Sequence, residues 1–175
     1  MKNGFQSGFF AGKFGISQSD LDRLLSSALA NGGDYADLYL EYRTRDMMAL
    51  EEGVLKNASR NISQGIGVRV VAGEKTGYAA ADTLDLHHMA SAAAEAGKIA
   101  VAGAPRASIH SAVSQTLHDL YRVPDPLVDA SFKTKLMLLQ EADRAARAYG
   151  QNIVEVRVVL ANEVKHVLIH NSTGA

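Results

Sequence analysis

The chain has no cysteine among its 175 residues. Disulfide bonds and thiolate-ligated zinc sites are therefore excluded, and the composition is compatible with a reducing cytosol. No stretch of about 18 apolar residues is present, so the sequence offers no transmembrane helix. Long blocks of like charge are also lacking and the formal net charge is only −1, which gives no indication of a nucleic-acid-binding surface. We expect a cytoplasmic protein that binds neither membranes nor nucleic acids.

What the chain does have is the composition of a folded globular domain. Its 47% hydrophobic and 21% charged residues are typical of soluble proteins, and a chain of this length can bury a sizeable core. Residues 1–15 contain four phenylalanines, but glycines, polar residues and Lys13 interrupt the apolar run that a signal peptide needs. We therefore expect residues 1–15 to be a flexible leader and residues 16–175 to form one domain.

Three segments have the apolar periodicity of amphipathic helices, namely residues 19–30, 85–100 and 132–149. In the first, Ser19 and Asp22 have the spacing of a capping box. Asp85 is expected to cap the second helix and Ser131 the third. The predicted inner face of the second helix is mostly alanine, which indicates close packing; it consists of Leu86, Met89, Ala90, Ala93 and Ala96.

An alternation of apolar and polar residues predicts strands at residues 35–43, 47–51, 54–59, 65–71 and 76–81. The turns between them are short, which favours antiparallel pairing because parallel neighbours need long crossovers. After a proline-containing connection at residues 102–129, two more strands are predicted at 153–161 and 164–170, joined by a turn at Asn162-Glu163. The fold class is therefore α+β, with an antiparallel sheet or meander packed against about three helices.

The last residues, Asn171-Ser172-Thr173-Gly174, form a strong turn signal. A turn of this kind normally leads into another strand, and a strand without a neighbour leaves backbone groups unsatisfied. We therefore expect the sequence to be the N-terminal part of a longer protein.

The histidines do not predict a metal site. His87 and His88 are adjacent, so they point about 100° apart on a helix. His166 and His170 share one face of a strand but lie roughly 13 Å apart, too far for one ion. We expect these side chains to be solvated or to lie on an edge strand.

Two further motifs allow more than one interpretation. Glu51 and Glu52 at a hairpin tip are either an acid–base pair or, more simply, solvated carboxylates. The G-x-G of Gln64-Gly-Ile-Gly-Val-Arg69 is followed by a strand rather than a helix, which argues against a dinucleotide site. Its glycines mark a bulge or the close approach of a backbone, either from a neighbouring segment or from a peptide substrate. The sequence contains no self-contained catalytic constellation.

Several segments resemble the TldD/PmbA family. They are Asp34-Tyr-Ala-Asp-Leu-Tyr-Leu-Glu41, Leu50-Glu-Glu-Gly-Val-Leu-Lys56 and Leu168-Ile-His-Asn-Ser-Thr-Gly174. Gln64-Gly-Ile-Gly-Val-Arg69 and Gly73-Glu-Lys-Thr-Gly-Tyr-Ala79 resemble the TldD branch in particular. The resemblance extends from about residue 16 to the end of the chain. It marks nine residues as part of a peptide cleft or of a structural motif: Gln64, Gly65, Gly67, Arg69, Gly73, Glu74, Lys75, Thr76 and Gly77.

The resemblance implies the N-terminal α+β domain of a TldD-like zinc metallopeptidase, a family first described as modulators of DNA gyrase. Such enzymes act in the cytoplasm on unfolded peptides, as heterodimers with a TldE/PmbA partner. Their H-E-x-x-x-H motif and cysteine ligand lie in the second half of the chain. This sequence has neither that motif nor a cysteine, so no catalytic or metal-binding residue carries over.

The resemblance therefore leaves two functions open. In the first, the chain helps form the peptide cleft and the assembly interface of a peptidase, and is inactive and free of zinc when alone. In the second, it is a non-enzymatic interaction module, a short product that binds a partner or a gyrase-related target. The reading frame downstream of residue 175 distinguishes them, because only the first function requires an H-E-x-x-x-H motif there.

Overall fold

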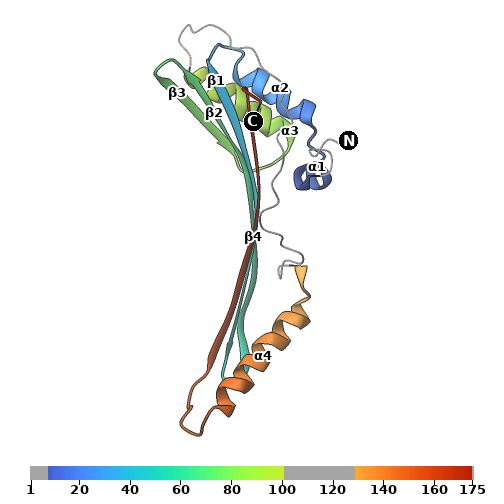
Figure 1. Ribbon diagram of the computed structural model, residues 1–175, viewed down its shortest axis with the longest axis vertical. Helices are drawn as coiled ribbons and strands as arrows, with labels where there is room; N and C mark the ends of the chain where they lie inside the picture. The colour runs from blue at the N-terminus through green and yellow to red at the C-terminus, as the bar shows by residue number, and fades with distance from the viewer. Residues whose placement is uncertain (1–7, 101–128, 175) are drawn as a thin grey trace. The chain divides into compact units, whose positions relative to one another are not determined.

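The computed structural model describes residues 8–100 and 129–174, which form helices on an antiparallel sheet (Figure 1). In chain order the elements are α1 (Phe9–Phe14), α2 (Gln18–Ala28), β1 (Tyr35–Glu51), β2 (Val54–Ala72), β3 (Lys75–Ala81), α3 (Leu86–Ala100), α4 (Phe132–Ala148) and β4 (Arg157–Asn171). The strand order in the sheet is β3-β2-β1-β4. The predicted α+β class with an antiparallel sheet is confirmed.

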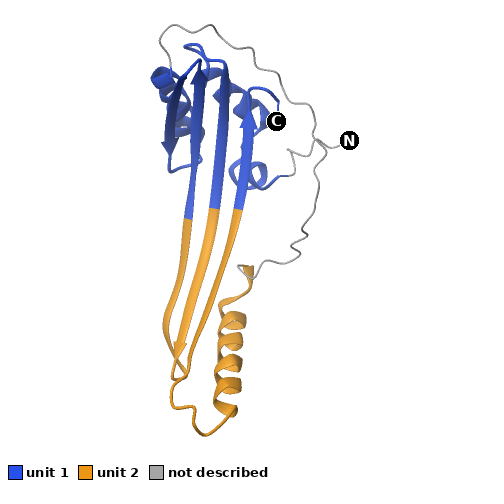
Figure 2. Ribbon diagram, turned by 60° about the vertical axis from the view of Figure 1, so that its left-hand side comes forward, with its two compact units in different colours: residues 1–42, 63–118, 166–175 blue, residues 43–62, 119–165 orange. Residues whose placement is uncertain are grey.

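The chain divides into two compact units (Figure 2). Unit 1 comprises residues 1–42, 63–118 and 166–175, and unit 2 comprises residues 43–62 and 119–165. The strands β1, β2 and β4 each contribute residues to both units. Each unit has its own cluster of buried apolar side chains.

The core of unit 1 lies between the sheet and helices α2 and α3. Along β1, Ala36, Leu38 and Leu40 are buried, and Val68 and Val70 of β2 are buried with them. Every second residue of a strand faces the same side, so this alternation places one continuous apolar face against the helices. Leu21 and Leu25 of α2 and Met89 of α3 are among the side chains that cover this face. The resulting cluster is the larger of the two.

The leader predicted for residues 1–15 is a packed helix in its second half. Phe9–Phe14 form α1, which ends at Gly15 with φ of 69°. Phe10 is buried, and the Phe9 ring stacks on His166 with centroids 3.6 Å apart. Three of the four phenylalanines, Phe9, Phe10 and Phe14, therefore belong to or pack against the core, whereas residues 1–7 lie outside the described part of the chain. The predicted connection at residues 102–129 lies outside it as well, apart from its last residue.

In unit 2, helix α4 packs on one face of the sheet. Leu139 of α4 is buried with Met48 and Leu50 of β1. Leu55 of β2 and Val158 of β4 pack against this cluster from the neighbouring strands. Ser131 caps α4 through a hydrogen bond that its Oγ accepts from the Thr134 N–H, which confirms the predicted cap.

The strands are longer than the sequence predicts. β1 has 17 residues and β2 has 19, where two short strands each were expected. The predicted turn at Asn162-Glu163 is wrong, because β4 continues through it. In β1 and in β4 a polar residue occupies an inward position of the alternation, Asp46 and Asn162 respectively. Each of these residues interrupts the apolar pattern that predicts a strand, so one long strand is predicted as two short ones. Conversely, residues 153–156 precede β4 and are not in a strand.

Candidate functional site

The nine residues that the sequence marks lie in a single β-hairpin of unit 1. β2 and β3 pair in antiparallel register from Ile66↔Ala81 to Ala72↔Lys75. The first four marked residues are on β2 and the last three on β3, with the turn at Gly73 and Glu74 between them. The pairing brings Gly67 opposite Ala80, and Arg69 opposite Tyr78.

The glycines of this hairpin are explained by close packing. A Cβ atom at Gly77 would lie 2.1 Å from the carbonyl oxygen of Ala96, because β3 packs directly against α3. At Gly65 it would lie 2.5 Å from the carbonyl oxygen of Ala81, and at Gly67 2.5 Å from the Tyr78 hydroxyl. The approaching atoms belong to the chain itself, which accounts for these positions without a peptide substrate.

The polar residues of the hairpin stabilise its conformation. Arg69 donates from Nε to Asp37 Oδ2 at 2.9 Å, and its guanidinium lies 5.8 Å from the Tyr35 ring. Burial, and next the Asp37 charge, raise the pKa of Tyr35. Gly73 has φ of 59° and donates its N–H to Asp34 Oδ2 at 2.6 Å, which fixes the turn. Glu74, Lys75 and Thr76 are exposed.

A cluster of charged side chains that the sequence did not indicate lies in unit 2. The Asp46 carboxylate is buried and accepts hydrogen bonds from Arg60 Nε at 2.7 Å and Arg60 Nη2 at 2.9 Å. Lys135 of α4, which is also buried, donates from Nζ to the same carboxylate. The Arg60 hydrogen bonds above all, and then Lys135, lower the pKa of Asp46 to about 2 against the opposing effect of burial. A buried carboxylate is stable when it is paired in this way.

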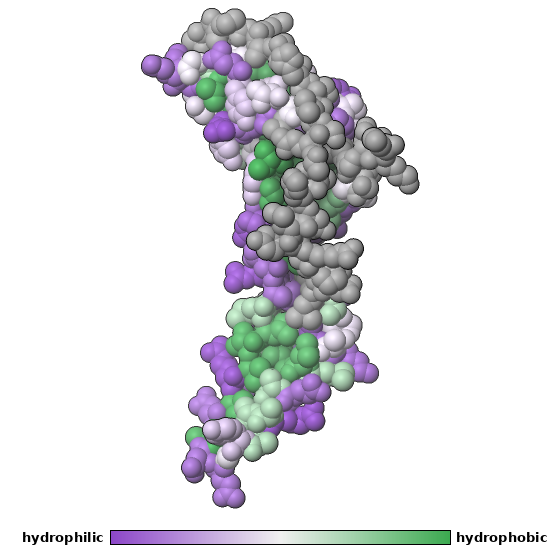
Figure 3. Space-filling model, in the orientation of Figure 1, coloured by the Kyte–Doolittle hydropathy of each residue, from purple (hydrophilic) through white to green (hydrophobic). Residues whose placement is uncertain are grey.

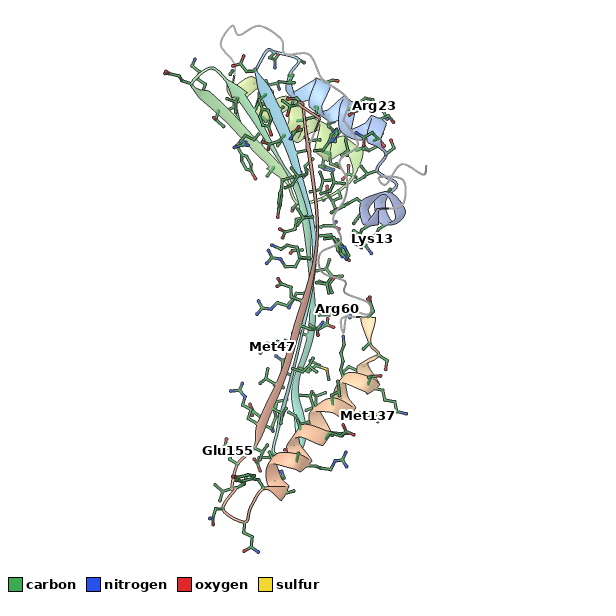
Figure 4. The ribbon with its side chains drawn as sticks, viewed as in Figure 1. Lys13, Arg23, Met47, Arg60, Met137 and Glu155 are labelled. Atoms are coloured by element: carbon green, nitrogen blue, oxygen red, sulfur yellow. The ribbon has the colours of Figure 1, made fainter. Side chains whose placement is uncertain are left out.

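A pocket of about 520 Å³ opens beside this cluster. Arg60, one of its lining residues, is labelled in Figure 4. The pocket is formed by residues of β1 and β2, by the segment before α4 and by the first turns of α4; the lining is Asp46, Met48, Ala58, Ser59, Arg60, Asp129, Ala130, Ser131, Phe132 and Lys135. The volume is within the range of small-ligand sites. The sequence does contain a signal for this site. Asp46 occupies a position of β1 where the alternation predicts an apolar residue, and Lys135 lies on the inner face of α4.

The acidic pair at the tip of the β1–β2 hairpin is held by other groups. Glu51 pairs with Arg157 at 3.0 Å, and Glu52 pairs with Arg147 at 3.2 Å. Glu52 also accepts the Val156 N–H at 2.8 Å, and this hydrogen bond is the main cause that lowers its pKa. Both carboxylates nonetheless remain accessible to solvent, with 40% of the Glu51 side chain and 51% of the Glu52 side chain exposed, which agrees with the simpler interpretation of solvated carboxylates. Their contacts link the hairpin to α4, to Val156 and to the start of β4.

The histidines that the structure describes have structural partners. His166 and His170 lie on β4, which is an edge strand of the sheet, as expected. His170 is buried there, and its Nε2 lies 3.0 Å from Asp22 Oδ1 of α2. His88 Nδ1 lies 2.6 Å from Asp85 Oδ2 at the exposed start of α3. Within residues 8–100 and 129–174, no three His, Cys, Asp or Glu side chains are arranged to hold a metal ion. The residues in this part of the chain therefore do not fit a zinc site.

Three apolar side chains of α4 are exposed: Phe132 by 56%, Met137 by 52% and Leu138 by 43%. Met137 and Leu138 lie on the side away from the buried Leu139, whereas Phe132, seven residues before Leu139, lies on the same side as Leu139 and lines the pocket. In the view of Figure 3, apolar surface gathers over unit 2, whereas polar residues predominate on other visible parts. None of the helices in the described ranges has the length and apolar character needed to cross a membrane.

Comparison with known proteins shows which family this sequence resembles. Residues 36–100 match the family described as PmbA/TldA metallopeptidase domain 1. The metalloprotease TldD homolog of Haemophilus influenzae is 33% identical over 147 residues, which cover 81% of this chain and 30% of that protein. The TldD homolog of Buchnera aphidicola from Acyrthosiphon pisum is 28% identical over 160 residues, which cover 91% of this chain and 33% of that protein. The chain thus spans about a third of the length of these relatives.

Solved structures have the same fold at lower identity. A Thermotoga maritima protein named as a modulator of a DNA gyrase has a TM-score of 0.67 and 18% identity, covering 90% of this chain and 36% of its own. TldE from Thermococcus kodakarensis has a TM-score of 0.59 and 19% identity, covering 89% of this chain and 35% of its own. The family match and the identity to the TldD homologs agree with this fold. The chain therefore belongs to the TldD/PmbA family, through the first domain of that family.

Proposed function

We propose that this chain is the N-terminal domain of a TldD-like zinc metallopeptidase of the cytoplasm, which processes unfolded peptides together with a TldE/PmbA-like partner. The domain contributes to the peptide cleft and to the assembly interface. The observation that carries the proposal is the 33% identity over 147 residues to a protein named as a metalloprotease TldD homolog.

The proposed domain supplies no catalytic group of its own. The sequence has no cysteine and no H-E-x-x-x-H motif, and the described residues offer no metal-binding cluster. Zinc and its ligands would therefore belong to another part of the enzyme. What this chain offers is a folded scaffold with a polar pocket in unit 2 and an exposed apolar helix face.

The exposed face of α4 supports a role in assembly. Met137 and Leu138 are neighbours on the side of the helix away from the buried Leu139, and both remain accessible to solvent in the described structure. Exposed apolar side chains that lie together are typical of surfaces that bind another protein. We therefore assign the contact with the TldE/PmbA-like partner to the side of α4 that carries Met137 and Leu138.

The assembly role is tested by measuring complex formation with the TldE/PmbA-like protein of the same genome. Size-exclusion chromatography with light scattering is expected to give a 1:1 complex. Met137→Glu places a charge on the apolar face and is expected to weaken the complex at least about tenfold. Gln151→Glu, on an exposed residue outside α4, adds the same charge away from this surface; it is the control and should leave the affinity unchanged. No complex at micromolar concentration would contradict the assembly role.

The catalytic part of the proposal is tested separately. The purified chain alone is expected to bind no stoichiometric zinc and to leave an unfolded casein substrate intact. Proteolysis by the chain alone that a chelator abolishes would contradict the assignment. If the downstream reading frame has no H-E-x-x-x-H and the chain still binds its partner, the interaction-module function replaces the peptidase function.

A further inference from the structure

The outer edge of β2 has no neighbouring strand over residues 54–62 in the described part of the chain. β3 pairs with β2 only from Ile66 to Ala72, and β1 lies on the other side. Almost all side chains from 54 to 62 are exposed, with only Leu55 and Ser59 partly buried. A strand edge of this kind presents backbone N–H and C=O groups that an added strand can bind.

The pocket of unit 2 adjoins this edge because β2 changes its alternation there. Leu55 packs toward Leu139 of α4, and Arg60 reaches Asp46, which bonds to Lys135 on the same helix. Arg60 is five positions after Leu55, so a regular strand would direct their side chains to opposite faces. Three consecutive residues, 58–60, instead line one pocket. A shift of one residue in the alternation is what a β-bulge produces, and bulges often reorient side chains beside binding sites.

The charge of the edge selects the kind of strand that it accepts. Residues 54–65 contain Lys56 and Arg60 and no acidic residue. Arg60 and Lys135 share the single Asp46 carboxylate, so this cluster beside the edge keeps a net positive charge. Pairing two copies of this edge in antiparallel fashion would bring lysine and arginine side chains together, which is unfavourable. A strand with acidic side chains has the complementary charge. Backbone pairing is otherwise independent of sequence, as recognition of unfolded peptides requires.

We infer that the edge of β2 at residues 54–62, with the adjacent pocket, binds an extended acidic segment of unfolded polypeptide by strand addition. One side chain of the added strand enters the pocket beside Ser59 and Arg60, whose volume of about 520 Å³ accommodates it. The inference rests on the proposed function, since it assigns the unfolded substrate to a defined part of this domain. It also moves peptide binding away from the Gly65–Gly77 hairpin, where β2 is paired on both sides.

The binding test uses the full chain and a fluorescein-labelled peptide in which threonine and glutamate alternate. Roughly ten residues match the length of the edge at about 3.3 Å per residue. Fluorescence anisotropy gives the Kd, and hydrogen exchange of the chain locates the contact. Binding is expected to slow amide exchange at residues 54–62 and to leave the edges of β3 and β4 unchanged.

Two N-methylated peptides distinguish strand addition from side-chain binding. One peptide carries methyl groups on the amides of the odd positions and the other on the even positions. Only one set of amides faces the partner strand, so one peptide is expected to lose binding while the other keeps it. Equal affinities of the two peptides would overturn the inference. The comparison needs no protein variant, so misfolding of a variant cannot affect the result.

The charge preference is tested with Lys56→Glu and the matched control Lys98→Glu, which alters an exposed lysine of α3. Lys56→Glu is expected to raise the Kd of the acidic peptide about 1.5- to 5-fold and to lower that of a threonine–lysine peptide. Lys98→Glu should change neither affinity.

Other occupants of the edge give different results. Protection of residues 54–62 that grows with protein concentration, without peptide, would assign the edge to a second copy of the chain. Protection in the free chain at every dilution, with no peptide binding, would assign it to a segment outside the described residues. Either result overturns the inference. The chain can also bind the peptide at this edge and yet form no complex with the TldE/PmbA-like protein. That result would support the inferred binding site and contradict the proposed assembly.

Discussion

The most crowded glycine is Gly77, where β3 meets α3. A Cβ atom at this position would lie 2.1 Å from the Ala96 carbonyl oxygen and 2.5 Å from the Ala100 nitrogen. Both are backbone atoms, so the helix or the strand must move to accept even one methyl group. Gly77→Ala is expected to lower the free energy of unfolding by about 1–3 kcal/mol or more, measured by urea denaturation. Gly150→Ala, where nothing lies within 4 Å, is the control and should change it by less than about 0.5 kcal/mol.

The buried Asp46 carboxylate makes stability depend on pH. Its pKa is lowered from 3.8 to about 2 in the folded protein, so the folded state favours the charged form. The stabilisation is therefore present above about pH 4 and is lost as the pH falls toward 2. For this buried group it amounts to about 2 kcal/mol.

Urea denaturation between pH 5 and 2 tests this dependence. Asp46→Asn is expected to lower stability at pH 7, because Arg60 and Lys135 lose their carboxylate, and to flatten the decline at low pH. Asp129→Asn, on an exposed residue that lines the same pocket, should retain the wild-type slope. The same slope in Asp46→Asn as in the wild type would show that other groups cause the decline.

Among the elements, α2 shows how a local hydrogen-bond pattern decides where a helix begins. Ser17 Oγ accepts the Asp20 N–H, and the Asp20 side chain accepts the Ser17 N–H at 2.8 Å. The Ser17 hydrogen bonds also lower the pKa of Asp20. Ser17→Ala is expected to destabilise the protein by about 1 kcal/mol. Ser19→Ala, two residues further along the helix, is expected to cost markedly less in the same thermal denaturation experiment, and equal losses would contradict the cap assignment.

The same helix illustrates what sequence patterns could and could not predict. Its apolar face was predicted because Leu21, Leu24 and Leu25 repeat at helical spacing, and these residues are buried. The cap was assigned to Ser19 rather than Ser17, because Ser17-Asp20 and Ser19-Asp22 have the same spacing. Only the packed structure distinguishes them, since Asp22 is engaged by His170 from the distant strand β4.

Long-range contacts likewise explain the errors in other elements. On α3 the predicted inner residues Met89, Ala93 and Ala96 are buried, but Leu86 is 45% exposed and Ala90 is exposed as well. Gly97 is buried instead, because a Cβ atom there would lie 2.2 Å from the Ala28 carbonyl oxygen of α2. The sequence cannot reveal which small residues meet another helix. For the same reason the pocket of unit 2 was missed, since Asp46 and Lys135 are 89 residues apart.

At the scale of the whole molecule, the chain has two separate clusters of buried side chains. The cluster of unit 1 draws on α2, α3 and all four strands, whereas that of unit 2 consists of Met48, Leu50 and Leu139 with a few partly buried neighbours. Buried apolar area is the main source of stability. We therefore expect unit 2 to open locally more readily than unit 1, as regions with few buried contacts do.

Leu139→Ala tests this expectation because Leu139 is the buried residue that α4 contributes to the small cluster. The substitution removes apolar contacts and leaves a cavity, which costs about 2–5 kcal/mol in well-packed sites. Hydrogen exchange is expected to accelerate at the amides of α4 and of residues 43–62, while those of α2 and α3 keep their wild-type rates. Leu138→Ala, on an exposed neighbour, should leave both sets unchanged. If Leu139→Ala accelerates exchange equally in both units, they unfold as one cooperative body, and a peptide bound at residues 54–62 would then stabilise the whole chain rather than unit 2 alone.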